Sequence, residues 1–164
     1  MTDPRFQTGG SRLLAFVIDG FVVSTLCGLI SWIVRADLGM AINVILGLIY
    51  SCVTAAYPVY MHGRFGQTFG KFIARVRVIG NDGSRISYRQ AAIRDIVPCL
   101  IAPVSMWYSL HQVVLGELPD LSLYYSISNL ALMWVLLELV TMFLNDQRRA
   151  IHDFIADTVV VRVS

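Results

Sequence analysis

The sequence predicts an all-α integral membrane protein with four transmembrane helices and a small cytoplasmic β-hairpin or sheet. Two observations predict this fold class. Of the 164 residues, 56% are hydrophobic and only 15% are charged, and the mean hydropathy is +0.65. So little polar surface cannot cover a soluble particle of this size. A helix needs about 20 apolar residues to cross the hydrocarbon core of a bilayer, and four runs of that length occur, at 13–34, 39–61, 96–115 and 122–144.

The basic residues lie almost entirely on one side of these predicted spans. Twelve of the 13 Lys and Arg residues precede the first span, lie between the second and third, or follow the fourth, and only Arg35 lies on the other side. Lys and Arg beside transmembrane helices usually stay in the cytoplasm. We therefore expect a single membrane domain, 1–164, with both termini, the loop 62–95 and the tail 145–164 in the cytoplasm.

The loop 62–95 contains the pattern of a β-hairpin. Residues 74–79 alternate apolar and basic side chains, the run Asn81-Asp82-Gly83 is typical of a turn, and residues 85–88 alternate again. The tail ends in a run of β-branched residues, 158–163. We expect the tail to join the hairpin in a small cytoplasmic sheet. Short disordered connectors are the alternative.

Small residues recur at four-residue spacing in the first two spans. They are Gly20, Ser24 and Gly28 in the first, and Gly47, Ser51 and Ala55 in the second. Small residues on one face let two helices approach closely in a bilayer. We expect the two stripes to face each other in an antiparallel pair or to form a homodimer contact, and a homo-oligomer is predicted on that basis. Chance spacing is the alternative.

Signals for other functions are weak. The segment 66–71 resembles a phosphate-binding loop, but three residues separate its glycines where four are needed, and Phe72 follows its Lys. No HExxH, GxSxG or Ser/His/Asp spacing occurs, the three cysteines form no CxxC pair, and no aromatic platform accompanies the basic residues. We therefore expect no enzymatic activity, no cofactor or metal, and no nucleic-acid partner. The predicted partner is the lipid bilayer, whose anionic headgroups suit concentrated basic charge.

Charged side chains inside apolar runs cost about 2.5–3.5 kcal/mol each on insertion and need a reason. Asp19 lies about 9 Å inside the first span at 1.5 Å per residue. Arg12, seven residues earlier, lies on the same face, and the Asp19 side chain leans toward it. The separation is too long for a certain direct contact, so a bridging group or water is expected. Asp153 is the candidate if the segment 149–156 folds back onto the membrane face.

The sequence around these charges resembles the RDD family of membrane proteins. The resemblance spans nearly the whole chain and is carried by Arg12-Leu13-Leu14-Ala15-x-x-x-Asp19, by Gly66-Gln67-Thr68-x-Gly70-Lys71 with the following Arg-Val-Arg-Val, and by Arg148-Arg149-Ala150-x-His152-Asp153 ahead of a Val-rich tail. The Arg and two Asp residues that give the family its name map onto Arg12, Asp19 and Asp153. The resemblance implies a bacterial inner-membrane protein, with transport proposed for an unsettled set of ligands and cation/proton exchange suggested for some members.

Two functional interpretations remain open. As a small transporter or cation/proton exchanger, the protein would bind a proton or a monovalent cation at Asp19 and Glu138, with Arg12 as charge partner of Asp19. As a non-transporting accessory or assembly protein, it would use the Arg and Asp residues as a structural lock that ties the tail and hairpin to the first helix. A polar path across the bilayer would favour transport. The sequence offers few residues for such a path: Ser24, Asn43, Thr54, His111, Asn129 and Glu138.

Overall fold

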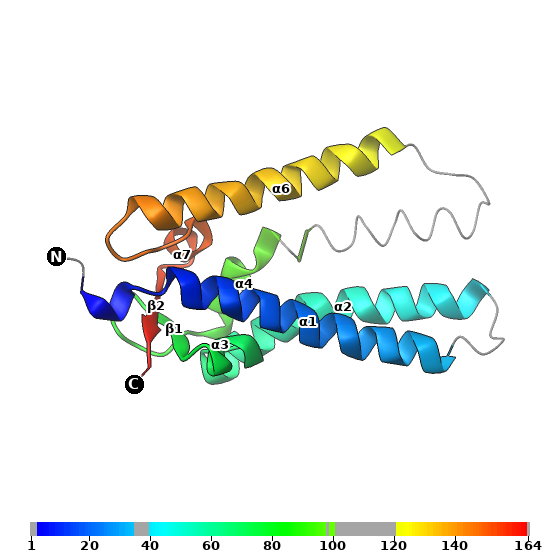
Figure 1. Cartoon of the computed structure of the whole chain (residues 1–164), viewed down its shortest axis with the longest axis horizontal. Helices are drawn as coiled ribbons and strands as arrows, with labels where there is room; N and C mark the ends of the chain where they lie inside the picture. Colours follow the sequence, from blue (N-terminus) through cyan, green and yellow to red (C-terminus); the bar gives the residue numbers. More distant parts are fainter. Residues whose placement is uncertain (1–2, 35–39, 98, 101–120, 164) are drawn as a thin grey trace.

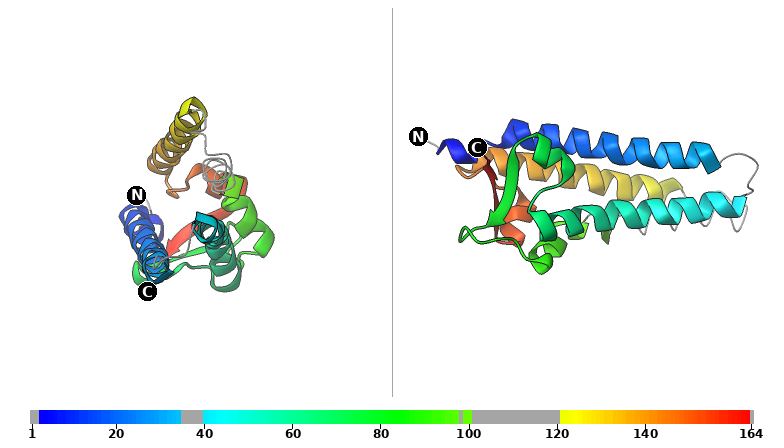
Figure 2. Two further views of the ribbon diagram at one scale, coloured as in Figure 1. Left: turned by 90° about the vertical axis from the view of Figure 1, so that its right-hand side faces the viewer. Right: turned by 90° about the horizontal axis from the view of Figure 1, so that it is seen from below.

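Three long helices and a group of short elements gathered at one end make up the described fold. The computed structural model describes residues 3–34, 40–97, 99–100 and 121–163. The long helices α1 (Gly9–Val34), α2 (Met40–Phe65) and α6 (Leu121–Leu144) extend along the longest axis, and both chain ends lie at the end that carries the short elements (Figure 1, Figure 2). The short elements are the 3-10 helix η1 (Pro4–Phe6), α3 (Phe69–Ile73), β1 (Val76–Gly80), α4 (Tyr88–Arg94), α7 (Ile151–Ile155) and β2 (Thr158–Arg162).

The long helices have the length and composition of membrane spans. In the described part of the chain, the segments that qualify are Pro4–Ile30, Ile45–Phe65 and Tyr125–Leu144. Large apolar side chains on these helices face outward, with Trp32 76% and Leu144 81% exposed. Such surface is favourable in contact with lipid and unfavourable in water. The three segments correspond to the first, second and fourth predicted spans. The third predicted span, 96–115, lies largely outside the described residues, so the count of four stays a prediction.

Local sequence signals explain where the short helices begin. Thr68 precedes α3, and its hydroxyl accepts a hydrogen bond from the Lys71 amide at 3.3 Å. Ser87 precedes α4 and forms a reciprocal capping box with Gln90, in which each side chain satisfies a backbone N–H of the other residue. Gly66 adopts a φ of 70°, a conformation that glycine reaches at no steric cost, and turns the chain from α2 toward α3.

The two strands form an antiparallel sheet between the loop and the tail. Val76 pairs with Arg162 and Gly80 with Thr158, which confirms that the tail joins the loop in a small sheet. The prediction of a second hairpin strand at 85–88 is wrong. Arg85 makes only an isolated bridge to Ile79, because the capping box at Ser87 starts helix α4 instead.

The buried core lies under this sheet, at the end of the helices. Inward-facing residues of β1 and β2 pack there against Ile86 and Ala91, which follow β1 in the sequence. The cluster consists of Val76, Val78, Ile86, Ala91 and Val160. The alternation in β1 therefore places Val76 and Val78 inward and Arg77 outward.

Close packing occurs at α3 and at the end of α2, away from the predicted small-residue stripes. A Cβ at Gly70 would lie 2.2 Å from the Ala15 carbonyl oxygen, so α3 rests directly on α1. At Gly20, Gly28 and Gly47 a Cβ would meet nothing within 4 Å. The expected close approach of the two stripes is therefore not found at these three glycines. The homodimer contact remains a prediction.

Candidate functional site

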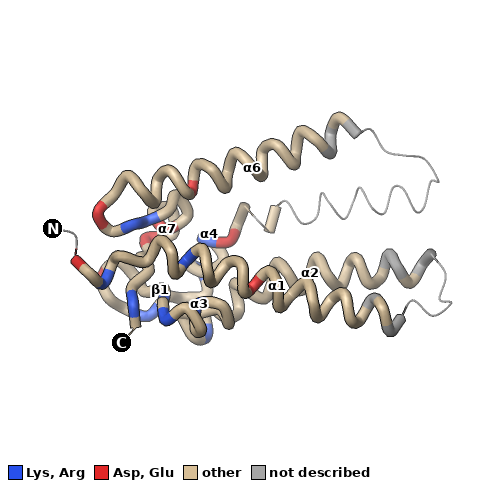
Figure 3. Tube along the Cα trace, viewed as in Figure 1, with Lys and Arg blue, Asp and Glu red and all other residues tan. Residues whose placement is uncertain are grey.

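Charged residues collect at the end of the molecule that carries the short elements. Figure 3 shows Lys, Arg, Asp and Glu gathered around α3, α4, α7 and the start of α1, while the described distal halves of the long helices are almost free of them. The charged side chains that line the interior come from several elements, namely α1, α3, α4, α6 and α7. The geometry divides them into a buried ion-pair cluster, a carboxylate clamp and two histidine bridges.

The ion-pair cluster centres on Asp153 of α7, whose side chain is fully buried. Arg12 of α1 donates from Nη2 to Asp153 Oδ2 at 2.6 Å, and Arg94 of α4 donates to the other carboxylate oxygen. The Ala150 amide adds a hydrogen bond of 2.9 Å to Oδ2. Burial raises the pKa of Asp153, but the two guanidinium groups lower it by more, so the carboxyl group stays ionised at neutral pH. The cluster therefore ties α1, α4 and α7 together.

Arg94 was not identified from the sequence. It lies 59 positions before its partner Asp153, and no periodicity links two residues so far apart. A signal was nonetheless present, because Arg94 and Asp95 stand immediately before the predicted third span. A pair of opposite charges at the edge of a membrane span is a candidate for a buried pairing.

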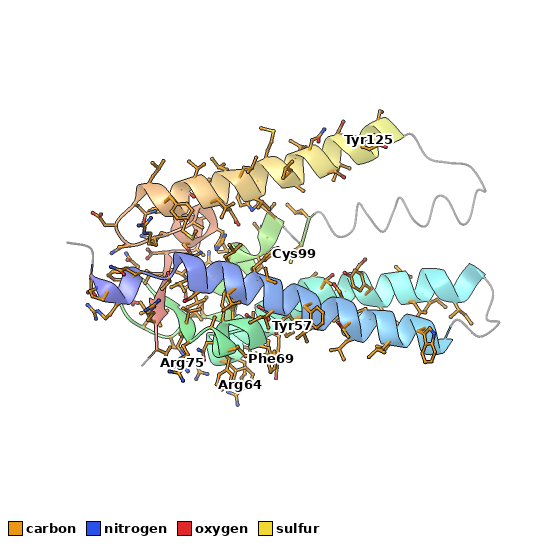
Figure 4. The ribbon with its side chains drawn as sticks, in the orientation of Figure 1. Tyr57, Arg64, Phe69, Arg75, Cys99 and Tyr125 are labelled. Carbon is orange, nitrogen blue, oxygen red and sulfur yellow. The ribbon has the colours of Figure 1, made fainter. Side chains whose placement is uncertain are left out.

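The carboxylate clamp consists of Asp19 and the donors that surround it. Its carboxylate accepts hydrogen bonds from the Thr68 hydroxyl at 2.5 Å and from the Gly70 amide at 2.8 Å. The Tyr57 hydroxyl donates to it at 3.0 Å and in turn accepts from the Phe69 amide at 2.9 Å. Figure 4 shows Tyr57 and Phe69 close together where α1, α2 and α3 meet. Asp19 therefore fixes the start of α3 against α1 and α2.

Of the predicted cluster of Arg12, Asp19 and Asp153, the structure brings one pair together and places the third residue apart. Arg12 and Asp153 form a direct ion pair. Asp19 belongs to the separate clamp around Thr68 and Gly70, without Asp153 as its bridge. The physical reason is proximity: α3 packs directly on α1, and its first turn presents free donors beside Asp19.

The first histidine bridge joins Glu138 of α6 to the ion-pair cluster. His152 Nδ1 contacts the Glu138 carboxylate, and Nε2 faces the guanidinium of Arg94 at 2.9 Å and that of Arg12 at 3.4 Å. Guanidinium groups only donate hydrogen bonds, so Nε2 must be the acceptor. Nδ1 must therefore carry the hydrogen, which it donates in the hydrogen bond to Glu138. Burial lowers the pKa of His152, and nearby Arg94 lowers it further. The imidazole is therefore neutral.

The second histidine bridge has the same pattern. His62 of α2 faces Asp95 through Nδ1 at 3.1 Å and Lys71 of α3 through Nε2 at 2.5 Å. The imidazole therefore donates to the carboxylate and accepts from the ammonium. Burial lowers the pKa of Lys71 to about 7, and Arg94 contributes in the same direction. Burial raises the pKa of Asp95, but the His62 hydrogen bond and nearby cations leave it below its usual range. Lys71 can therefore gain or lose a proton near neutral pH.

These groups meet at the polar end of a cavity of about 510 Å³ between α1, α2 and α6. Its walls are mostly apolar and include Phe16, Tyr50 and Trp134. Charged and titratable groups at its polar end are Arg12, Asp19, His62, Lys71, Arg94, Asp95, Glu138 and His152. Among the described residues, no group of three or more His, Cys, Asp and Glu side chains is arranged to hold a metal ion.

Sequence comparisons bear on the same residues. The family model described as the RDD family matches residues 8–157 and therefore includes the ion-pair cluster, the clamp and both bridges. Neither a curated protein nor a solved structure matches the chain.

Proposed function

Because the chain belongs to the RDD family and its long helices are those of a membrane protein, we propose that it exchanges cations for protons across a membrane. The observation that carries the proposal is the cavity of about 510 Å³ between the long helices, with titratable groups at one end. An exchanger needs a site that can hold either a proton or a cation, and carboxylates inside a membrane bundle are the usual groups for this task.

Glu138 is the carboxylate best suited to that task. It lies on the span α6 and lines the cavity, and its hydrogen-bond partner His152 is neutral. A neutral partner orients the carboxylate without adding a positive charge of its own. Asp153, in contrast, is enclosed by two guanidinium groups and cannot readily release them. We therefore assign proton and cation exchange to Glu138, with Asp19 as a second carboxylate along the cavity.

The charged end of the molecule is proposed to face the cytoplasm of a bacterium. The supporting observation is the distribution of Lys and Arg, twelve of 13 on one side of the spans. In that orientation the cavity receives protons and cations from the cytoplasmic side, and both termini are cytoplasmic.

A non-transporting accessory role is the second candidate. The ion-pair cluster favours this role. The Asp153 carboxylate has no exposed surface, and the side chains of Arg12 and Arg94 are only 10% and 2% exposed. Such a buried cluster is suited to holding α1, α4 and α7 in place. In this alternative the charged residues serve only to stabilise the fold, and the cavity binds no substrate.

Reconstituted liposomes distinguish the two candidates. An imposed Na⁺ or K⁺ gradient should change the internal pH, reported by an enclosed pH-sensitive dye. Glu138→Gln should abolish the change, whereas Asp146→Asn should preserve it, because Asp146 is exposed in the turn after α6. If correctly folded wild-type protein produces no pH change with either ion, exchange of these two ions is refuted.

A further inference from the structure

The charge balance of the cavity indicates which substrates it favours. With Asp153 included, four carboxylates meet three cationic side chains, which leaves a formal net charge of −1 when Lys71 is protonated and both bridging histidines are neutral. The carboxylates are those of Asp19, Asp95, Glu138 and Asp153, and the cations are Arg12, Lys71 and Arg94. An anionic substrate would therefore be repelled, and a cationic one attracted.

This negative charge is concentrated on the carboxylates that line the cavity. Both guanidinium groups are held by Asp153, on the far side of His152. Asp19 is held by hydroxyl and amide donors, and Glu138 by a neutral imidazole. Neither of these two carboxylates has a full positive charge as its hydrogen-bond partner.

The remaining walls are mostly aromatic and apolar, and among the described lining residues only Ser24, Thr54 and Thr68 add aliphatic hydroxyl groups. Na⁺ or K⁺ that left water would need several oxygen ligands in place of its hydration shell. Four aromatic residues line the cavity instead, and we call them the aromatic wall: Phe16, Tyr50, Tyr57 and Trp134. Trp134 is one helical turn from Glu138 on α6, so the indole and the carboxylate share one face of that helix. Aromatic faces attract organic cations.

We propose that the cavity binds a hydrophobic organic cation, whose apolar groups pack against the aromatic wall and whose positive charge faces the carboxylates of Asp19 and Glu138. The volume of about 510 Å³ is in the range of small-molecule sites, about 300–1,000 Å³. This inference rests on the proposed exchange function and specifies its substrate class. Protons compete with the cation for Glu138, which contacts His152 on α7. Arg12 on α1, Arg94 on α4, Lys71 and Asp95 line the same cavity.

Isothermal titration calorimetry with two probes of equal shape and opposite charge tests the proposal. Tetraphenylphosphonium should bind the purified protein saturably in a neutral detergent, and its affinity should fall as the pH is lowered. Tetraphenylborate, titrated separately, should show no saturable binding after subtraction of empty micelles. Equal affinity for both probes, or saturable binding of neither, overturns the proposal whether or not any variant folds.

Variants locate the site. Glu138→Gln should weaken tetraphenylphosphonium binding by about tenfold or more, and Trp134→Leu by about threefold to tenfold. Trp32→Leu is the matched control, because Trp32 is an exposed residue of α1 outside the cavity lining and its loss should leave affinity unchanged. If Glu138→Gln does not elute as a folded protein, the Trp134 and Trp32 variants decide the location. Equal effects of the Trp134 and Trp32 substitutions on tetraphenylphosphonium affinity would overturn the proposed location of the site.

Failure of this inference can be distinguished from failure of the proposed function. If Na⁺ or K⁺ gradients drive pH changes but tetraphenylphosphonium does not bind, the exchange function stands and the organic-cation site is refuted. If tetraphenylphosphonium binds with the expected charge selectivity but neither it nor a metal cation moves protons, the binding site stands and the exchange function is refuted.

Discussion

The ion-pair cluster predicts a strong energetic coupling between Arg12 and Asp153. Removing one member of a buried ion pair costs about 3–5 kcal/mol, because the other charge is left without compensation. Arg12→Met leaves Asp153 with Arg94 and the Ala150 amide, so its cost should be near 3 kcal/mol. Asp153→Asn leaves two guanidinium groups facing each other without a counter-charge, so its cost should approach about 5 kcal/mol.

A double-mutant cycle measures the coupling. The free energy of unfolding can be followed by tryptophan fluorescence as SDS is added to protein in mixed micelles. The Arg12→Met, Asp153→Asn double variant should lose about 2–3 kcal/mol less than the sum of the single variants, since the two charges are removed together. The variants of Arg12 and Asp19 should be nearly additive, because Asp19 belongs to the separate clamp. A coupling of Arg12 to Asp19 as large as that to Asp153 would refute the division into two networks.

Three further predictions address other parts of the structure. Lys71 has its pKa lowered from 10.5 to about 7 in the fold, so the unfolded chain holds more protons between these values. The free energy of unfolding should therefore rise as the pH increases across that window, and Lys71→Met should flatten the rise. Gly70→Ala should destabilise the protein by about 1–3 kcal/mol, because its Cβ would meet the Ala15 carbonyl oxygen. Gly20→Ala, where the added Cβ lies in open space, should not destabilise it. Equal melting temperatures of the two variants would contradict the packing of α3 on α1. A topology reporter inserted at Asp82 should give a cytoplasmic signal, and a periplasmic one would overturn the proposed orientation.

Much of the fold could be predicted from the sequence because hydropathy and β-branched runs act locally. The three described spans follow directly from apolar runs, and the Val-rich tail forms β2 as expected. The failure at 85–88 is also local in origin. The alternation of residue types there favours a strand, but Ser87 and Gln90 form a capping box that favours a helix, and the capping box prevails.

The site was less predictable because its partners are distant in sequence. The spacing of Arg12 and Asp19 places both on one face of α1, but only the tertiary fold shows that α3 supplies donors to Asp19. Arg94 reaches Asp153 across 59 positions, and the pairing of Lys71 with His62 depends on the turn at Gly66. Hydropathy identified Glu138 as an unusual residue of the fourth span, but only the structure places His152 beside it.

The most direct test of the central claim is proton release when a cation binds. Purified protein in weakly buffered detergent, with a soluble pH indicator, should release protons as tetraphenylphosphonium is added at mildly acidic pH. The release should diminish as the pH is raised, because fewer protons then compete with the cation. Folded Glu138→Gln should bind more weakly and release no proton, while Asp146→Asn should behave as wild type. Saturable binding without proton release at any pH, or undiminished release from Glu138→Gln, would contradict the claim that Glu138 exchanges a proton for a cation.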